Sequence, residues 1–165
     1  MKKAAAFLDR DGVINHDYGY VYKYKNFNLR PGVIKGLQLL TKKNYRIFIV
    51  TNQSGIARGL FKKKDVEILH KIIKKQFLKK KIVINDILFS PFHPDGKIKK
   101  YTKLSESRKP GNLMVKQLLK KWNTDLKNSF MIGDKNSDKI CAKISRLHFQ
   151  FAEKNFFNQI KSILK

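Results

Sequence analysis

The sequence predicts an α/β fold of the Rossmann-like, three-layer type, with a parallel sheet covered by helices on both faces. Short runs of apolar and β-branched residues alternate with longer segments whose apolar residues recur every three or four positions. This alternation is typical of βαβ units, which build parallel sheets. The chain has 165 residues without a recognisable linker or internal repeat. We therefore expect one domain, residues 1–165.

Five segments have the composition of buried strands. Residues 3–8, KAAAFL, form a short apolar run that ends at charged residues. Residues 45–50, YRIFIV, are rich in β-branched and aromatic side chains and are bounded by turn signals. The remaining predicted strands are residues 86–90, 129–134 and 147–152.

Five further segments have helical periodicity. Residues 31–43 begin with Pro31, which suits the first turn of a helix. Val33, Leu37 and Leu40 then recur at helical spacing. The other predicted helices are residues 63–80, 111–122, 137–145 and 155–164.

The chain is strongly basic, with a formal net charge of +25. Lysines outnumber arginines 31 to 6, whereas surfaces that grip phosphate lean more on the planar fork of arginine. We attribute most of the charge to biased codon usage and expect no nucleic-acid partner. The positive field would still attract a small anionic substrate.

Cysteine content and hydropathy favour the cytoplasm. Cys141 is the only cysteine, which excludes an intrachain disulfide and a cysteine-based metal cluster. The sequence has no apolar stretch near the roughly 20 residues that span a bilayer. The apolar run from Ala4 to Leu8 is too short for a signal peptide. We expect a cytoplasmic monomer with no membrane partner.

Polar residues capable of chemistry follow the first four predicted strands. In open parallel sheets, ligands bind beyond the carboxyl ends of the strands, so these residues are expected to converge. Each motif by itself also occurs as an ordinary turn or helix cap, and the prediction depends on their order and placement. They are Asp9, Asp11 and Gly12, then Thr51, Asn52, Gln53 and Ser54, then Arg108 and Lys109, then Asp134, Lys135 and Asp138.

This set is suited to phosphoryl transfer. Asp9 and Asp11 are two residues apart and share a face in extended backbone, where two carboxylates repel unless a cation lies between them. Oxygen ligands from Asp9 and Asp134 suit Mg²⁺. Asp9 can then attack phosphorus to form an aspartyl-phosphate, while Asp11 protonates the leaving oxygen and later deprotonates water. Thr51 and Lys109 would stabilise the phosphoryl oxygens.

The motifs FLDRDGVIN, IVTNQSGIARG, FHPDG, RKPG and MIGDK resemble those of the haloacid dehalogenase (HAD) superfamily, subfamily IIIA. The closer similarity is to the D-glycero-D-manno-heptose 1,7-bisphosphate 7-phosphatases, with histidinol-phosphate phosphatases as near relatives. It covers residues 4 to about 145. The resemblance implies a Mg²⁺-dependent phosphatase in lipopolysaccharide or nucleotide-heptose biosynthesis, acting on the 7-phosphate of a small sugar bisphosphate.

The resemblance also implies residue roles. Asp9 is the nucleophile and Asp11 the general acid/base, while Thr51 and Lys109 stabilise the phosphoryl group. The Mg²⁺ ligands are Asp9, the backbone carbonyl of Asp11, and Asp134. Asp138 either assists the site through a hydrogen bond or caps the next helix, and the sequence leaves both open. Substrate-binding positions are Asp17, Tyr20, Asn52, Gln53, Ser54, Arg108 and Lys135.

Residues 90–112 form a long loop in which many family members bind structural zinc. Hydroxyls and a phenyl ring cannot replace the thiolate and imidazole ligands of zinc, so we predict no zinc here. The four corresponding positions hold Ser90, Phe92, Ser105 and Ser107. We expect the loop to be ordered instead by inward packing of Phe92, Ile98, Tyr101 and Leu104.

Three other functions remain open from the sequence. A histidinol-phosphate phosphatase would use the same chemistry on a different leaving group. A DNA 3′-phosphatase would add a basic stripe beside the pocket and a steep dependence on salt. A non-catalytic binding module would tolerate losses among the acidic residues, whereas Asp9, Asp11, Lys109 and Asp134 are all present.

Overall fold

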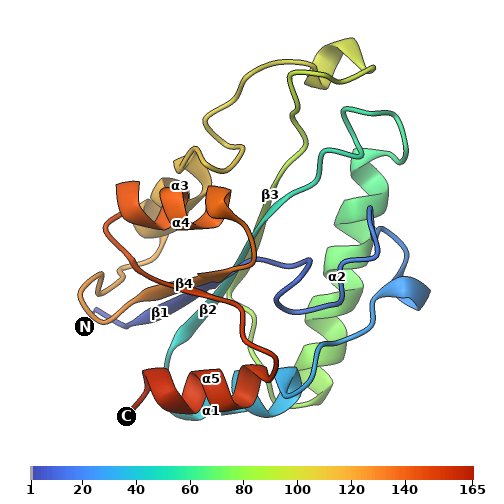
Figure 1. Cartoon of the computed structure of the whole chain (residues 1–165). Coiled ribbons are helices and arrows are strands. Elements are labelled where there is room, and N and C mark those ends of the chain that lie inside the picture. Colours follow the sequence, from blue (N-terminus) through green and yellow to red (C-terminus); the bar gives the residue numbers. More distant parts are fainter. Residues whose placement is uncertain (1) are drawn as a thin grey trace.

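A computed structural model describes residues 2–165 and contains a five-stranded, fully parallel sheet (Figure 1). The strand order is β3-β2-β1-β4-β5, so the first strand lies at the centre. All four strand pairs are parallel, which confirms the predicted fold class. The strands are β1 (Ala5–Leu8), β2 (Arg46–Asn52), β3 (Asp86–Ser90), β4 (Phe130–Gly133) and β5 (His148–Phe151).

Helices cover both faces of this sheet. On one face lie α1 (Val33–Lys42), α2 (Lys63–Lys79) and α5 (Phe156–Ile163), and on the other lie α3 (Leu113–Lys121) and α4 (Asn136–Ile144). All ten predicted segments are present, with ends that differ by one or two residues. Two single turns of 3-10 helix, Tyr24–Asn26 and Lys99–Tyr101, are too short to show a periodicity in the sequence.

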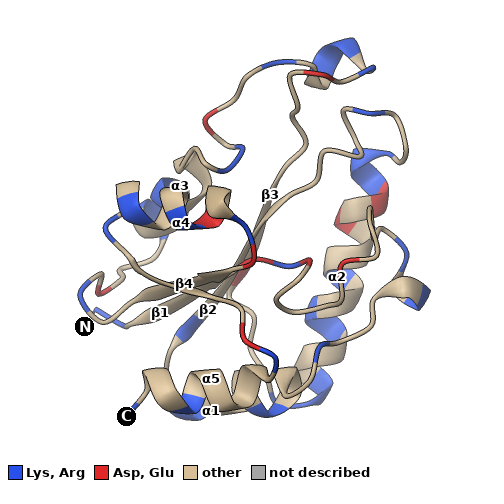
Figure 2. Cartoon of the chain, in the orientation of Figure 1, with Lys and Arg blue, Asp and Glu red and all other residues tan. Residues whose placement is uncertain are grey.

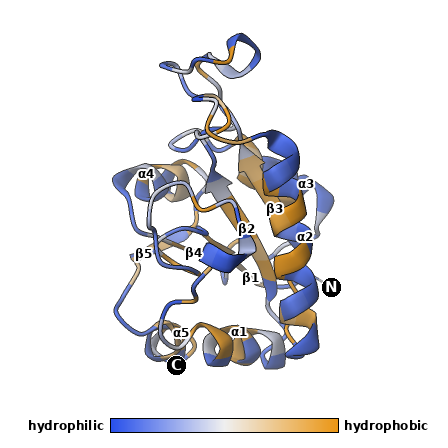
Figure 3. Ribbon diagram, turned by 90° about the vertical axis from the view of Figure 1, so that its right-hand side faces the viewer, coloured by the Kyte–Doolittle hydropathy of each residue, from blue (hydrophilic) through white to orange (hydrophobic). Residues whose placement is uncertain are grey.

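The strand β1 shows why the sheet is apolar without alternation. Ala6 and Leu8 pack in the layer of α1, α2 and α5, whereas Ala5 and Phe7 pack in the layer of α3 and α4. Successive side chains of a strand point to opposite faces, and here both faces are covered. All four residues are therefore buried, and Figure 3 shows hydrophobic residues in the sheet and, together with hydrophilic ones, along helices such as α2.

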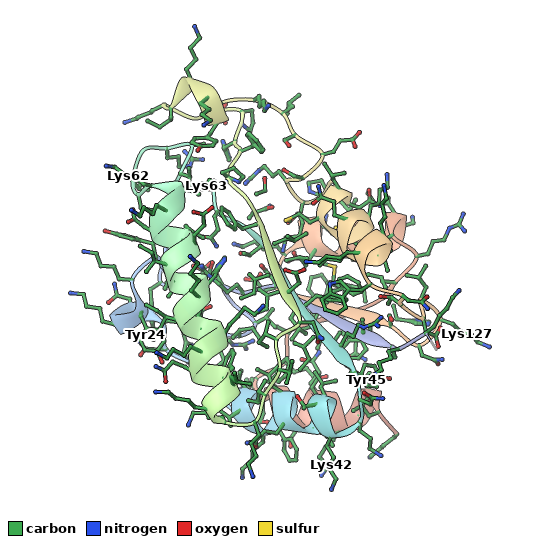
Figure 4. All side chains as sticks on the ribbon, turned by 180° about the vertical axis from the view of Figure 1, so that it is seen from behind. Tyr24, Lys42, Tyr45, Lys62, Lys63 and Lys127 are labelled. Carbon is green, nitrogen blue, oxygen red and sulfur yellow. The ribbon has the colours of Figure 1, made fainter. Side chains whose placement is uncertain are left out.

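Charged residues have two distributions (Figure 2). Lys and Arg are spread over the helices and loops, and several acidic residues lie where strands end. Figure 4 shows the start of α2 from behind, where Lys62 and Lys63 border a hollow shared with Ile98 and Tyr101 of the long loop. Within residues 2–165, every helix is too short or too polar to cross a membrane.

The long loop packs less of its apolar surface than expected. Tyr101 contacts the small core cluster of Ile56 and Phe61, and the ring centroids of Phe92 and Tyr101 lie 6.0 Å apart. Leu104, however, is 84% exposed and Ile98 is 42% exposed, so the prediction that both pack inward is wrong.

Backbone hydrogen bonds explain why the loop does not need those two side chains. The peptide N–H groups of Lys97 and Ile98 both donate to the carbonyl oxygen of Ala57, at 2.7 and 2.9 Å. The N–H of His93 donates to the carbonyl of Tyr101 at 3.2 Å. Main-chain hydrogen bonds therefore hold the loop against the segment after β2. These bonds do not require the side chains of Ile98 and Leu104 to be buried.

Candidate active site

The chain leaves β1 through Asp9, Asp11 and Gly12, directly above the centre of the sheet. The carboxylate of Asp9 is buried and accepts a hydrogen bond from the N–H of Arg10 at 2.8 Å. Gly12 has φ of +84°, and a Cβ atom there would overlap the carboxylate of Asp134. Only glycine satisfies both constraints, so Gly12 allows β1 and β4 to bring their aspartates together.

Three carboxylates meet at this point, from Asp9, Asp134 and Asp138. One oxygen of each lies within 4.8 Å of the others. Burial, together with the charges of Asp138 and Asp11, raises the pKa of Asp9 to about 7 against the opposing effect of Lys109. Burial also raises the pKa of Asp134, whose Oδ1 is buried without a hydrogen-bond partner among the described residues. These three carboxylates share one buried ammonium group, that of Lys109, so a further cation would stabilise them.

The donors present fit a hard divalent cation. Carboxylate oxygens from Asp9 and Asp134 are the ligands that Mg²⁺ prefers, and two of them suffice because the ion keeps several waters. Asp138 is less suited to this role because its Oδ2 accepts from the N–H of Lys135 and its Oδ1 lies 2.6 Å from the ammonium nitrogen of Lys109. Two of the three ligands expected from the sequence, Asp9 and Asp134, lie close together, and Asp138 lies close to both.

Lys109 is buried among these acids. Its ammonium nitrogen lies 3.0 Å from Oδ1 of Asp9 and 2.6 Å from Oδ1 of Asp138, and it donates to the carbonyl of Val50 at 2.8 Å. Burial by itself would lower the pKa of Lys109, but the charges of Asp9 and Asp138 outweigh it and raise that pKa. Lys109 therefore stays charged beside the predicted nucleophile.

The position of Lys109 depends on Asn52 at the end of β2. The Asn52 side chain accepts from the Lys109 N–H and donates to the Lys109 carbonyl, both at 2.9 Å. This double contact joins the long loop to the sheet and uses the amide of Asn52 for positioning. Asn52 also lines the pocket in which we expected it to bind substrate.

Asp138 performs both roles that the sequence left open. Its Oδ2 accepts from the N–H of Lys135 at 3.0 Å in a capping box at the start of α4. Its Oδ1 lies beside Lys109. A Cβ atom at Gly133 would overlap this side chain, so the glycine is what lets α4 begin so close to β4.

The carboxylate of Asp11 is held from several directions. Arg10 contacts both of its oxygens, Asn15 Nδ2 donates to Oδ1 at 2.8 Å, and Gln53 Nε2 donates to Oδ2 at 2.9 Å. Gln53 also donates to the hydroxyl of Thr51 at 2.9 Å, so it connects Asp11, which follows β1, with Thr51 in β2. Arg10 and Asn15 were not predicted, although Arg10 stands between the two aspartates of the DRDG motif.

A pocket of about 320 Å³ opens beside Asp11. Lys135 and Asp17 both line it and contact each other, with Nζ 3.5 Å from Oδ2. The structure brings six of the seven predicted substrate-binding residues to this pocket. Its lining consists of Asp11, Asp17, Gly19, Tyr20, Asn52, Gln53, Ser54 and Lys135.

Arg108, the seventh, lines a neighbouring hollow with Lys109 and Pro110. Its Nη1 donates to the carbonyl of Phe92 at 3.3 Å. Burial lowers the pKa of Arg108, and the charge of Arg58 lowers it further. Arg58 was not predicted as a site residue, since the sequence gives no signal that it comes near Arg108.

Serine hydroxyls occupy the centre of the long loop. The Oγ of Ser107 lies 3.1 Å from that of Ser90 and 2.9 Å from that of Ser105. Hydroxyl groups of this kind are not zinc ligands in proteins, so the chemistry of these donors does not fit zinc. Hydrogen bonds join three of the four positions at which the resemblance would place zinc ligands, namely Ser90, Ser105 and Ser107.

Comparisons with known proteins show that this chain is similar to phosphatases. A family model described as polynucleotide kinase 3 phosphatase matches residues 7–162. The chain is similar to a D-glycero-beta-D-manno-heptose-1,7-bisphosphate 7-phosphatase of Rhodopseudomonas palustris, with 38% identity over 99% of this chain and 91% of the relative. It is also similar to a D-glycero-alpha-D-manno-heptose-1,7-bisphosphate 7-phosphatase of Campylobacter jejuni, with 40% identity over 99% and 93% of the two chains.

Solved structures show the same fold. A D,D-heptose 1,7-bisphosphate phosphatase from B. bronchiseptica, complexed with magnesium and phosphate, has a TM-score of 0.78 and 25% identity, over 98% of this chain and 86% of that one. A HAD-like protein from Mesorhizobium loti has a TM-score of 0.87 at 23% identity, over 99% and 86% of the two chains. The second similarity concerns the fold alone.

Proposed function

The chain belongs to the heptose-bisphosphate phosphatase family of HAD-like phosphatases, and we propose that it removes the 7-phosphate of D-glycero-D-manno-heptose 1,7-bisphosphate. The observation that carries this proposal is the buried contact between Asp9 and Lys109, beside the carboxylate of Asp134. A carboxylate held next to a fixed ammonium group, at the carboxyl ends of β1 and β4, is arranged for attack on phosphorus and stabilisation of the phosphoryl oxygens.

We propose that the reaction proceeds in two transfers. An oxygen of Asp9 forms a bond to phosphorus as the bond between phosphorus and the sugar oxygen breaks, and Asp11 gives its proton to that sugar oxygen. Water then attacks the aspartyl-phosphate, with Asp11 taking a proton from the water, and inorganic phosphate leaves as Asp9 is restored. Lys109 and the hydroxyl of Thr51 contact the transferring oxygens in both steps.

Asp9 and Asp134, with the carbonyl of Asp11, would hold the Mg²⁺ ion that the family implies. Bound there, the ion would neutralise charge on the phosphate and keep Asp9 ionised despite a pKa that burial raises to about 7. The positions suited to zinc in related loops carry hydroxyls, and we propose that this loop is ordered without zinc.

The pocket supports a substrate with a second charged group. Lys135 lines the pocket and Arg108 lines a second hollow, so both could bind an anionic group, and the small volume of about 320 Å³ suits a sugar. Relatives that act on the alpha and on the beta anomer are similar to this chain to nearly the same degree, at 40% and 38% identity. We therefore propose the bisphosphate as the substrate class without assigning the anomer.

The family model described as polynucleotide kinase 3 phosphatase favours one alternative substrate, a 3′-phosphorylated DNA end. The net charge of +25 would assist binding of such a polyanion. A DNA substrate predicts that kcat/KM falls steeply with salt, whereas a small sugar phosphate predicts a shallow dependence. We propose the sugar phosphate because the pocket is small and is lined from three separate loops.

The test is a panel of phosphorylated compounds with Mg²⁺. It contains both anomers of the heptose bisphosphate, histidinol phosphate and a 3′-phosphorylated oligonucleotide, with inorganic phosphate release as the readout. We expect one or both heptose bisphosphates to be hydrolysed with the highest kcat/KM, and Asp9→Asn to abolish turnover while the protein still melts cooperatively. A higher kcat/KM for another compound of the panel would identify that compound as the substrate instead. Phosphatase activity in Asp9→Asn would reject the covalent route.

We also propose that the enzyme works as a monomer in the cytoplasm. The proximity of Asp9, Lys109 and Asp134 within one chain supports the monomer. Light scattering after size exclusion would give the mass of a single chain if this is correct, and twice that mass if it is not.

A further inference from the structure

Arg10 is an unusual residue to find at the centre of this protein. Its side chain is 0% exposed, and it lies between the two aspartates that leave β1. A fully buried arginine needs partners for its five donors. Here those partners come from four separate parts of the chain, one of which is the predicted acid/base.

A single nitrogen of Arg10 connects three parts of the site. Nη2 lies 3.0 and 2.9 Å from the two oxygens of Asp11, 3.2 Å from Oε1 of Gln53, and within hydrogen-bond distance of the Val21 carbonyl. Val21 follows the segment that places Asp17 and Tyr20 at the mouth of the pocket. The orientation of the guanidinium therefore sets both the Asp11 carboxylate and the end of that segment.

The other end of the guanidinium is anchored on α2. Nη1 of Arg10 lies 3.0 Å from Nε2 of the buried His70. Since arginine can only donate, Nε2 of His70 must accept and its proton must be on Nδ1. Burial, together with the charge of Arg10, lowers the pKa of His70 to about 3, so the ring remains a neutral acceptor near pH 7. The edge of the ring packs on Phe89, with centroids 5.4 Å apart.

We infer that Arg10 and His70 form a positioning pair that holds the Asp11 carboxylate in the direction needed to exchange a proton with the substrate. This inference rests on the proposed phosphatase reaction. Neither residue touches the reacting atoms, and His70 acts only through Arg10. The planar guanidinium of arginine suits this role because its N–H groups can bind both oxygens of a carboxylate and so fix its orientation. The ammonium group of lysine acts as a point charge and does not fix that orientation.

Two substrates separate this role from a general effect on folding. A sugar alkoxide leaves phosphorus only if a proton is supplied, whereas the phenolate of p-nitrophenyl phosphate leaves without one. In His70→Leu, the anchor of Arg10 is lost while the site is otherwise retained. We expect kcat/KM for the heptose bisphosphate to fall by about tenfold to a hundredfold, as part of the general acid contribution is lost. The value for p-nitrophenyl phosphate should stay within about threefold, because no proton is needed.

Three further variants complete the design. His70→Gln keeps an acceptor for Arg10 and should restore most of the activity towards the sugar substrate. Ile73→Ala removes a buried side chain one turn further along α2, so it should lower the melting temperature without changing the ratio of the two activities. Arg10→Lys should show the same selective loss as His70→Leu, and it serves as the primary comparison if His70→Leu does not fold.

An equal loss on both substrates, or an unchanged ratio in both Arg10→Lys and His70→Leu, would overturn the inference. If the wild-type protein hydrolyses neither substrate, the proposed function fails and the crystal structure of His70→Leu becomes the test. In that structure we expect the Asp11 carboxylate to have left its contacts with Arg10, and a carboxylate in its original place would overturn the positioning role.

Discussion

The ammonium nitrogen of Lys109 lies 2.6 Å from Oδ1 of Asp138, and both side chains are buried. Asp138 is fixed by the capping box at the start of α4, whereas Lys109 comes from the far end of a long loop. The contact with Asp138 therefore fixes the position of the Lys109 side chain, although Lys109 lies in a loop. It keeps the charge of Lys109 at 3.0 Å from Asp9, where the phosphoryl group is expected.

Replacing Asp138 by asparagine tests whether Asp138 positions Lys109. The amide oxygen can still cap α4, but the negative charge beside Lys109 is lost. We expect kcat to fall about tenfold, with a change in melting temperature of only a few degrees, because buried charge-assisted contacts contribute roughly 1.5–3 kcal/mol. The control is Asp65→Asn, which alters the corresponding capping box of α2 far from Lys109. If both variants have the same kcat, Asp138 is only a cap.

Replacing Lys109 by methionine leaves the acidic cluster without its internal cation. Removal of one partner from a buried ion pair costs about 3–5 kcal/mol, so the free energy of unfolding at pH 8 without metal should fall by that amount. The loss should be smaller at pH 5, because Asp9, with a pKa of about 7, is then protonated. Denaturant unfolding at the two pH values measures this. Lys135→Met, at an exposed site, should change stability little, and an equal loss at pH 5 and 8 would contradict the explanation.

Binding of Mg²⁺ should depend on pH through Asp9. The pKa of this group is raised from 3.8 to about 7 in the folded protein, so the metal-free fold binds a proton more tightly than the unfolded chain. Its contribution to stability is therefore lost as pH rises from about 4 to 7. Below pH 7 the ion must displace that proton, so the rise in melting temperature caused by Mg²⁺ should be larger at pH 8 than at pH 6. Equal rises would show that Asp9 is not a ligand.

The serine cluster of the long loop should support substrate binding more than chemistry. Ser107 contacts Ser90 and Ser105 through its hydroxyl, and the loop that it holds carries Arg108. In Ser107→Ala we expect KM to rise about threefold to tenfold with little change in kcat, since the loss of hydrogen bonds worth roughly 1 kcal/mol frees the loop. Ser105→Ala, which removes the contacts of Ser105 with Ser107 but keeps the contact between Ser107 and Ser90, should have a smaller effect.

The same loop gives a test for zinc. A chelator selective for zinc should leave both activity and melting temperature unchanged, whereas EDTA should stop activity until Mg²⁺ is restored. Loss of stability with the zinc chelator would mean that the loop recruits the metal through residues other than those predicted.

Local patterns in the sequence were sufficient for the secondary structure and for the placement of the acids. Neighbouring strand residues such as Ile49 and Val50 are buried against opposite faces of the sheet and therefore give unbroken apolar runs, and each run is followed directly by its polar residues. Because parallel strands end at one edge, the convergence of Asp9, Thr51 and Asp134 was predictable from order alone.

The loop side chains were less predictable. Leu104 and Ile98 looked like packing residues because they are apolar, but main-chain contacts with Ala57 hold the loop and leave both exposed. Hydropathy predicts which side chains favour burial, but it does not show whether the fold provides a surface that covers them.

What the sequence by itself determined is the fold class, the order of the strands along the chain and the chemistry available at their ends. Only the tertiary structure decided which groups become partners: Asp138 with Lys109, His70 with Arg10, and Ser107 with Ser90. The physical reason is that the periodicity of apolar residues shows which face of each helix or strand is buried against the core. A hydrogen bond between distant residues depends on the direction of each side chain after the layers have packed, and no local pattern carries that direction.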